Sequence, residues 1–405
     1  MKSIELIGSA DKCCGCGACY VSCPQYAITM KESQEGFLYP VINESLCIDC
    51  KRCLKVCKFK APQLNTGEKQ TYAAHAIDTD MRKVASGGIF SSLAQSVLDA
   101  QGIVYGCAMF HDDGQLVAKH ICVTQKEELD KLKGSKYVQS NAADVYCDVK
   151  DNLLKQKVVL FSGTPCQIAG LKGYLQREYP TLYTVEVVCH GVPSLKLFQS
   201  YIGYIEGIEK IRIIDFKFRD KTQGWKLYGK MVLKNTNGDI TEKYFETEES
   251  SYYQMFLNSY TYRDSCYKCP FASENRQADI TIGDYWCIEL VHPELFTDNG
   301  GSLNMSDGVS CIVVNNKQGN NLLKKHGQGV LKWESTYAKA SKYNAQLIRS
   351  SMLKPERKKV FELYEQGYDK IEKWYQKRLA KIKLERKIRK MIPKSLKRVV
   401  RKIIK

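Results

Sequence analysis

The chain has 405 residues, 18 cysteines and a formal net charge of +17. A chain of this length can bury two or three hydrophobic cores, which excludes the small disulfide-framed classes of protein. Because +13 of the net charge lies in residues 377–405, the rest of the chain is nearly neutral, and this disfavours a body built to bind nucleic acid.

The cysteine motif C-x₂-C-x₂-C-x₃-C occurs twice in the first sixty residues. A proline, Pro24, follows the motif in its first copy only. The first copy consists of Cys13, Cys16, Cys19 and Cys23, and the second of Cys47, Cys50, Cys53 and Cys57. This pattern is typical of a ferredoxin domain with two 4Fe-4S clusters, so we predict a small bacterial-type ferredoxin domain over residues 1–62.

In such domains the last cysteine of each run serves the other cluster. We therefore assign the first three cysteines of one run and the last of the other to each cluster. The two sets are Cys13, Cys16, Cys19 and Cys57, and Cys47, Cys50, Cys53 and Cys23. Zinc and disulfides are the alternatives, but zinc sites usually carry two pairs rather than this run given twice.

A mixed α/β body is expected after a polar linker over residues 63–71. Its first part, 72–150, contains strand patterns at 72–78, 102–110 and 117–123, a glycine-led helix at 86–98 and a short helix at 126–132. Its second part, 151–350, begins with a buried strand from residue 157, a turn, a helix at 167–178 and a strand at 183–188. This order suits a parallel unit whose functional loops lie at strand ends. Further strands are expected at 211–220, 226–234 and 279–284.

Residues 351–405 are predicted to form a charged helical tail. Leu384, Ile388 and Met391 recur at helical spacing, and Pro393 interrupts the run. Helices with one apolar and one cationic face suit an anionic membrane surface, where each basic residue adds up to ~1 kcal/mol. A solvated tail is the alternative, and nucleic acid is disfavoured because few aromatic residues are interleaved for stacking.

No uncharged apolar run approaches the ~20 residues of a membrane span, and no secretory leader is recognisable before Cys13. We therefore expect a cytoplasmic protein whose tail attaches it peripherally to the inner face of the membrane.

Isolated cysteines carry weak information by themselves. Cys166 and Cys189 lie in loops at predicted strand ends, and Cys266 and Cys269 form a C-x₂-C pair that suits zinc or redox chemistry equally. The other cysteines are expected to be structural: Cys14, Cys107, Cys122, Cys147, Cys287 and Cys311.

Considered together, several motifs resemble the beta subunits of coenzyme F-420-reducing hydrogenases and dehydrogenases. They occur in this order at residues 86–90, 134–140, 162–171, 189–194, 218–220 with 224–225, 262–263, 266–271 and 278–284. The resemblance covers about residues 1–345 and implies an iron-sulfur flavoprotein whose mixed-sheet body binds FAD.

The resemblance implies roles for particular residues. Cys166, Cys189, Cys266 and Cys269 match cysteines that hold a further 4Fe-4S cluster near the flavin. Residues that match the cofactor-binding positions are Ser86, Gly87, Gly88, Lys136, Gly163 and Thr164. Glycines there would let the backbone approach a flavin or its pyrophosphate, although ordinary turns explain them as well.

The sequence thus predicts an oxidoreductase that passes electrons between 4Fe-4S clusters and a small organic substrate through FAD. An electron-donor or acceptor protein is its expected partner. Similar proteins with a cationic tail occur among bacterial proteins associated with surface polysaccharide synthesis. The alternative is a non-catalytic electron-transfer subunit without a substrate site. No catalytic acid or base is assigned: His190 is expected to be a loop histidine bound to a backbone carbonyl.

Overall fold

A computed structural model describes residues 9–391 except 63, 64, 66, 68, 223 and 226, with side chains described up to residue 384. Within these residues, the centre of the molecule is an eight-stranded mixed sheet of order β13-β3-β12-β11-β7-β6-β4-β5. The strands in that order are Val330–Ser335, Gln70–Ala76, Ser310–Val314, Ile280–Asp284, Leu182–Val187, Val159–Gly163, Ile103–Asp112 and Gln115–Val123. The four strands β11, β7, β6 and β4 are parallel, and the outer pairs are antiparallel.

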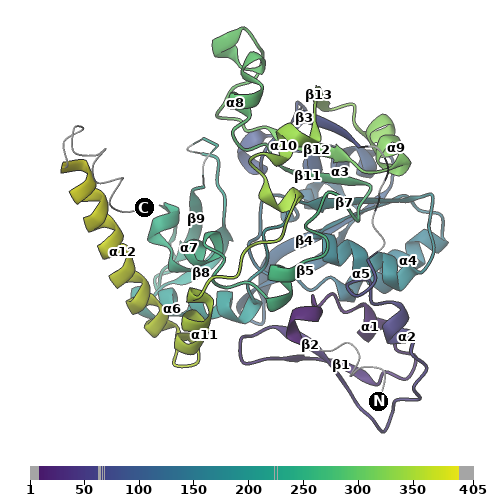
Figure 1. The fold of residues 1–405 in the computed structure, drawn as a ribbon, viewed down its shortest axis with the longest axis horizontal. Helices are drawn as coiled ribbons and strands as arrows, with labels where there is room; N and C mark the ends of the chain where they lie inside the picture. Colours follow the sequence, from purple (N-terminus) through teal and green to yellow (C-terminus); the bar gives the residue numbers. More distant parts are fainter. Residues whose placement is uncertain are drawn as a thin grey trace, which may run out of the picture.

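Helices cover both faces of the sheet (Figure 1). Apolar side chains of α3 (Ile89–Asp99) and α9 (Lys317–His326) share one core with Val104 of β4. On the other face, α4 (Tyr146–Leu154) and α5 (Pro165–Leu175) share a core with Tyr105, the next residue of the same strand. Alternate residues of a strand point to opposite faces, so these buried strands are apolar on both sides.

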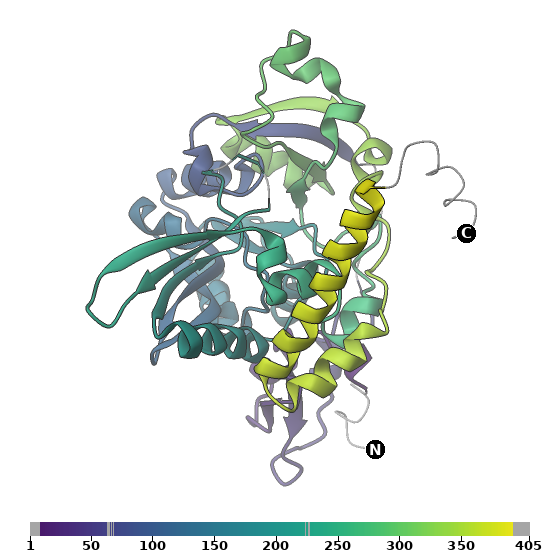
Figure 2. The same cartoon turned by 90° about the vertical axis from the view of Figure 1, so that its left-hand side faces the viewer.

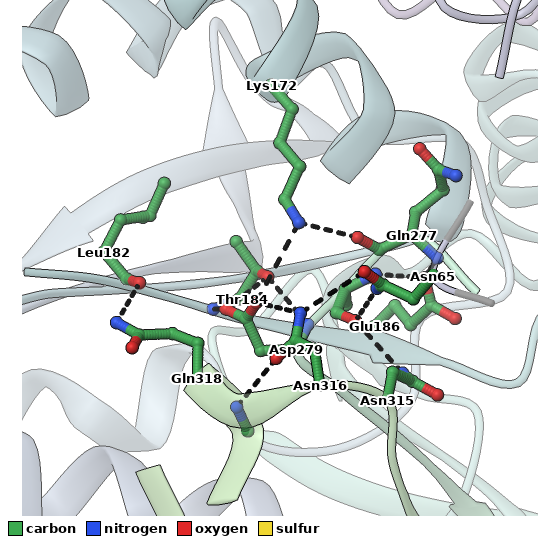
Figure 3. A network of polar contacts seen from close by, with 12 residues as sticks. Asn65, Lys172, Leu182, Thr184, Glu186, Gln277, Asp279, Asn315, Asn316 and Gln318 are labelled. Carbon is green, nitrogen blue, oxygen red and sulfur yellow. Dashed lines mark hydrogen bonds and ion pairs between the residues drawn. The ribbon is translucent and has the colours of Figure 1, made fainter. Parts of the chain in front are cut away.

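A buried polar network ties β7 to the start of β11 (Figure 3). The backbone amide and the hydroxyl of Thr184 both donate to Asp279 at 2.7 Å. Glu186 accepts a hydrogen bond from Thr281 at 2.9 Å and forms an ion pair at 2.5 Å with Arg276, both side chains being fully buried. Because buried polar groups are costly when unpaired, these contacts specify the register of the two central strands.

The ferredoxin region lies at the lower edge of the molecule in Figure 1, against α5. It consists of an antiparallel pair, β1 (Ile28–Glu32) and β2 (Leu38–Ile42), and two one-turn helices, α1 (Ala18–Val21) and α2 (Arg52–Lys55). Ala18 and Val56 are buried in the same core as Leu171 of α5. The domain is therefore packed onto the body.

A second group of elements lies beside the central sheet. A three-stranded antiparallel sheet, β8 (Arg212–Lys217), β9 (Gly229–Lys234) and β10 (Ile240–Phe245), shares an aromatic core with α6 (Leu195–Glu209) and α7 (Ser251–Leu257). Figure 2 shows α12 (Tyr368–Met391) in yellow, running alongside α11 (Glu356–Tyr364). Tyr368, Ile371, Tyr375 and Leu379 are buried at helical spacing, so the first half of α12 packs against the body.

The remaining elements are short. They are α8 (Ile288–Val291) and α10 (Tyr337–Ser341), and the 3₁₀ turns Ala10–Lys12, Met81–Lys83, Lys126–Lys131, Ala143–Val145, Thr247–Glu249, Asp264–Lys268, Pro293–Leu295, Thr297–Asn299 and Ala345–Leu347.

The mixed α/β fold with an N-terminal ferredoxin region is confirmed. The short helix predicted at 126–132 is a 3₁₀ helix, Lys126–Lys131. Pro393 and the rest of the tail lie outside the described residues. Among the residues described, no helix combines the length and apolar character needed to cross a membrane.

Candidate redox site

The first cysteine set gathers around α1. Cys13, Cys16, Cys19 and Cys57 are close enough for their thiols to interact electrostatically, so a cysteine of the second run joins three of the first. Burial raises the pKa of the Cys13 thiol to about 11. A cluster binds cysteines as thiolates, and burial disfavours the charged thiolate. The positive charge of the cluster iron must therefore offset the cost of burying that thiolate. The structure thus brings together the four cysteines of the first predicted set, and their role as ligands of one cluster stays a prediction.

The second set lines a pocket at the outer side of the ferredoxin region. Cys23, Cys47, Cys50 and Cys53 surround this pocket together with apolar side chains such as Ile28. The backbone amide of Ala27 donates to the Cys23 sulfur at 3.3 Å. Cys50 is exposed, so this set lies nearer to solvent than the first.

Four cysteines from distant parts of the body form a third set. Cys166 is in the first turn of α5, Cys189 follows β7, and Cys266 and Cys269 belong to one short segment. Their thiols interact electrostatically with one another, and burial raises the pKa of Cys266 and of Cys269 to about 12. The structure therefore brings together the four cysteines that the family resemblance singled out.

None of the described His, Cys, Asp and Glu side chains converge in threes on a point suited to one metal ion. A 4Fe-4S cluster takes its thiolates on separate irons, so its ligands need not converge in that way.

Cys166 lies in the first turn of α5, where its sulfur is 3.2 Å from the Thr164 hydroxyl. Thr164 and Gln167 form a capping box at the helix start, with the Thr164 amide donating to Gln167 at 2.9 Å. Cys14 lies between the first and third sets and hydrogen bonds with the sulfurs of both Cys16 and Cys166. Hydrogen bonding by Cys14 lowers the pKa of Cys166 to about 7. Sequence reasoning treated Cys14 as structural and missed this position.

The predicted cofactor loop, Ser86 to Gly88, lies between β3 and α3. A Cβ on Gly87 would be 2.4 Å from the carbonyl oxygen of Ala74, so this glycine is required by strand packing. Ser86 adopts a left-handed backbone (φ 51°), and its hydroxyl donates to the Val309 carbonyl at 3.0 Å. The ammonium of Lys221 donates to the carbonyl oxygen of Ser86. A strained backbone held in this way is a frequent feature of functional loops.

Asp284 anchors a polar and aromatic cluster beside this loop. Its carboxylate pairs with Arg219 at 2.5 Å and accepts a hydrogen bond from Trp225 at 2.9 Å. The rings of Trp225 and Trp286 stack with centroids 5.7 Å apart. One guanidinium nitrogen of Arg219, Nη2, is buried without a hydrogen-bond partner. An unpaired buried polar group is costly, so this atom indicates a place for a polar ligand.

The other three predicted cofactor residues are engaged by the protein itself. The Lys136 ammonium donates to the carbonyl oxygens of Lys133 at 2.7 Å and Leu132 at 3.0 Å. Gly163 ends β6, and Thr164 caps α5. His190 is exposed, and the expected hydrogen bond of its ring to a backbone carbonyl is not observed among the described residues.

The third cysteine set and the Asp284 cluster lie at one edge of the sheet, where the parallel strands β6, β7 and β11 end. Strand β6 ends at Gly163, shortly before Cys166, and β7 ends at Val187, shortly before Cys189. Strand β11 ends at Asp284 itself. Asp284 pairs with Ser310, which pairs with Ala74 of β3, so the loop from β3 to Ser86 starts at the same edge. Ligand sites in open α/β sheets lie at this carboxyl edge.

Three family models match the chain. The coenzyme F420 hydrogenase/dehydrogenase beta subunit N-terminal model matches residues 71–146, and its C-terminal counterpart matches residues 156–338. A 4Fe-4S dicluster domain model matches residues 12–61. The chain belongs to the coenzyme F420 hydrogenase/dehydrogenase beta-subunit family. It adds an iron-sulfur dicluster domain of the electron-transfer type to the family's oxidoreductase body.

The matches to individual proteins cover very different shares of the chain. The chain is 35% identical over 83 residues to acetyl-CoA decarbonylase/synthase complex subunit alpha 1 of Methanosarcina mazei, a match covering 20% of the chain and 10% of that subunit's length. An uncharacterized protein of Methanocaldococcus jannaschii is 21% identical over 358 residues, covering 79% of this chain and 88% of the relative. A chain in the F420-reducing [NiFe] hydrogenase complex of Methanosarcina barkeri aligns with a TM-score of 0.43 at 17% identity, covering 74% and 94% of the two chains.

Proposed function

We propose that the protein is an iron-sulfur flavoprotein oxidoreductase that passes electrons between three 4Fe-4S clusters and a flavin-linked organic substrate. The observation that carries the proposal is the convergence of Cys166, Cys189, Cys266 and Cys269 beside the ferredoxin region. These cysteines come from segments that are far apart in the sequence. A 4Fe-4S cluster takes four thiolate ligands, and the four thiols match that number. Electrons would pass between the ferredoxin clusters and the flavin through this third cluster.

The residues at the carboxyl edge of the sheet fit a flavin. The unpaired Arg219 nitrogen is a donor suited to the oxygens of the flavin ring, and the half-buried Trp225–Trp286 pair offers a planar surface. Bound FAD would supply the exchange between one-electron and two-electron chemistry. Asp284 orients the Arg219 guanidinium through their ion pair, and Lys221 holds the Ser86 carbonyl in place.

The substrate is a small organic molecule, and a separate protein supplies or takes the single electrons. The basic tail would place the enzyme on an anionic membrane surface, a location that suits a role in surface polysaccharide synthesis. A non-catalytic electron-transfer subunit is the second candidate, and the exposed position of Cys50 in the second set favours electron exchange with another protein.

Stepwise anaerobic reduction, followed by electron paramagnetic resonance for the clusters and by absorbance for the flavin, tests the proposal. In the wild-type protein, electrons delivered to the ferredoxin clusters should reach the flavin within one protein molecule. In Cys189→Ala, the ferredoxin clusters should still be reduced while flavin reduction is slowed at least tenfold. Equal flavin reduction in both proteins, or no flavin in a cluster-loaded chain, contradicts the proposal and favours the electron-transfer subunit.

A further inference from the structure

Arg263 is a fully buried cation at the junction between the ferredoxin region and the body. Its guanidinium donates to the carbonyl oxygens of Cys13 at 3.2 Å and Leu38 at 2.8 Å, and to the side-chain oxygen of Gln139 at 3.2 Å. Gly15 leaves room for it, since a Cβ there would lie 2.6 Å from Arg263 Nη2. The contacts hold the positive charge in one place between the two parts of the chain.

The hydrogen-bond acceptors of Arg263 are all neutral. It also lies over the aromatic rings of Phe37 at 4.9 Å and Tyr39 at 4.4 Å. The neighbouring carboxylates of Glu35 and Asp264 are both bound by Arg357, at 2.5 Å and 2.9 Å. Among the described residues, Arg263 forms no ion pair with a carboxylate. Burying a charge without a directly paired carboxylate is costly, so further negative charge at this site would stabilise the guanidinium.

The groups near the Arg263 charge include cysteines of two different sets, besides Tyr39 and the Glu35 carboxylate that Arg357 binds. Arg263 contacts the first set through the Cys13 carbonyl oxygen, and its own carbonyl oxygen accepts a hydrogen bond from the Cys266 amide of the third set at 2.9 Å. A 4Fe-4S cluster with four thiolate ligands carries a net negative charge, and reduction adds one more. Such clusters on both sides of the guanidinium would provide the missing counter-ion.

We propose that Arg263 is the shared counter-ion of two neighbouring 4Fe-4S clusters, the one held by the Cys13 set and the one held by the Cys166 set, and that it raises the reduction potential of both. This inference rests on the proposed function for the third cluster. In a transfer, one electron would leave one of these clusters as the other accepts it, with no bond changed. A fixed positive charge near both clusters would favour the extra electron on either of them, so it would raise both potentials.

The test is an anaerobic redox titration of the full-length, cluster-loaded chain followed by electron paramagnetic resonance. In Arg263→Gln, both midpoint potentials should shift to more negative values while the iron content stays unchanged. Arg263→Lys keeps the charge, so its midpoint potentials should lie close to those of the wild-type protein. Arg378→Gln is the matched control: Arg378 also lies over two rings, Tyr260 and Trp374, but no cysteine lies among its contacts, and its loss should leave both potentials unchanged.

Unchanged potentials in Arg263→Gln would overturn the inference, as would an equal shift in Arg263→Lys. If Arg263→Gln prevents cluster loading, loading must return in Arg263→Lys, and loss of loading in both variants also overturns it. Failure of the proposed function would be detected separately, because the wild-type protein would then contain about eight irons and no third cluster.

Discussion

Gly173 of α5 faces the backbone carbonyl of Val56, and a Cβ on residue 173 would lie 2.2 Å from that oxygen. The ferredoxin region therefore rests on α5 with no room for even a methyl group at this point. In the proposed function, electron transfer between the first cluster and the body would depend on this close packing.

Gly173→Ala should force the two parts of the chain apart. Overpacking of this kind costs about 1–3 kcal/mol, although alanine stabilises a helix relative to glycine. Gly203→Ala in α6 is the control, because no atom lies within 4 Å of a Cβ placed there. Denaturant unfolding of the cluster-loaded proteins should show lower stability for Gly173→Ala and unchanged or higher stability for Gly203→Ala. Equal stability of the two variants would mean that this contact is not tight in solution.

Cys189→Ala should remove the third cluster and leave the ferredoxin clusters in place. We expect iron to fall from about twelve to about eight per chain, since one missing thiolate leaves the cluster with three ligands. Cys311→Ala is the control, because Cys311 is a buried cysteine of β12 outside the three sets. It should retain all the iron. Loss of iron from Cys311→Ala, or full iron in Cys189→Ala, would contradict the ligand assignment.

His120 should make stability depend on pH. Burial lowers the pKa of its imidazole to about 4, and the neutral ring bridges the Ser162 carbonyl at 2.9 Å and the Ser140 hydroxyl at 3.1 Å. The unfolded state binds a proton near pH 6.5 and the folded state does not, so this stabilisation is present above pH 6.5 and is lost as the pH falls toward 4. The slope is at most ~1.4 kcal/mol per pH unit.

Denaturant unfolding at pH 5.5 and pH 7.5 measures this effect. His120→Gln can keep both hydrogen bonds without a titratable group, so its stability should change less between the two pH values. An identical change in the two proteins would show that another group is responsible.

The tail prediction is tested with lipid vesicles. Deletion of residues 392–405 removes six of the chain's basic residues and should weaken sedimentation with anionic vesicles at least tenfold. Neutral phosphatidylcholine vesicles are the control and should bind neither protein. Equal binding of the full and shortened chains to anionic vesicles would assign any attachment to the folded body.

Sequence patterns predicted the parts of the fold that depend on local chemistry. The spacing of the ferredoxin cysteines was enough to place Cys57 with Cys13, and the buried strand before Gly163 was recognised together with the helix that follows it. The roles of Cys14 and Arg263 could not be predicted in this way. Arg263 is buried by Leu38 and Gln139, residues more than a hundred positions away, and such contacts leave no periodic pattern.

The cofactor loop shows another limit. Gly87 suggested close approach to a cofactor, but its nearest neighbours are Ala74 and Ser310 of adjacent strands. Arg219 was not selected as a site residue, because an unpaired buried donor is visible only after the chain is folded. Strand β12 (Ser310–Val314) was missed because it is a short apolar run, which periodicity alone does not assign.

The central claim is that one chain holds three clusters and a flavin. Iron, acid-labile sulfide and flavin should be measured in anaerobically purified, full-length protein whose loading is complete. The account predicts about twelve irons, about twelve sulfides and about one flavin per chain. About eight irons with no flavin would contradict it and leave a two-cluster electron carrier.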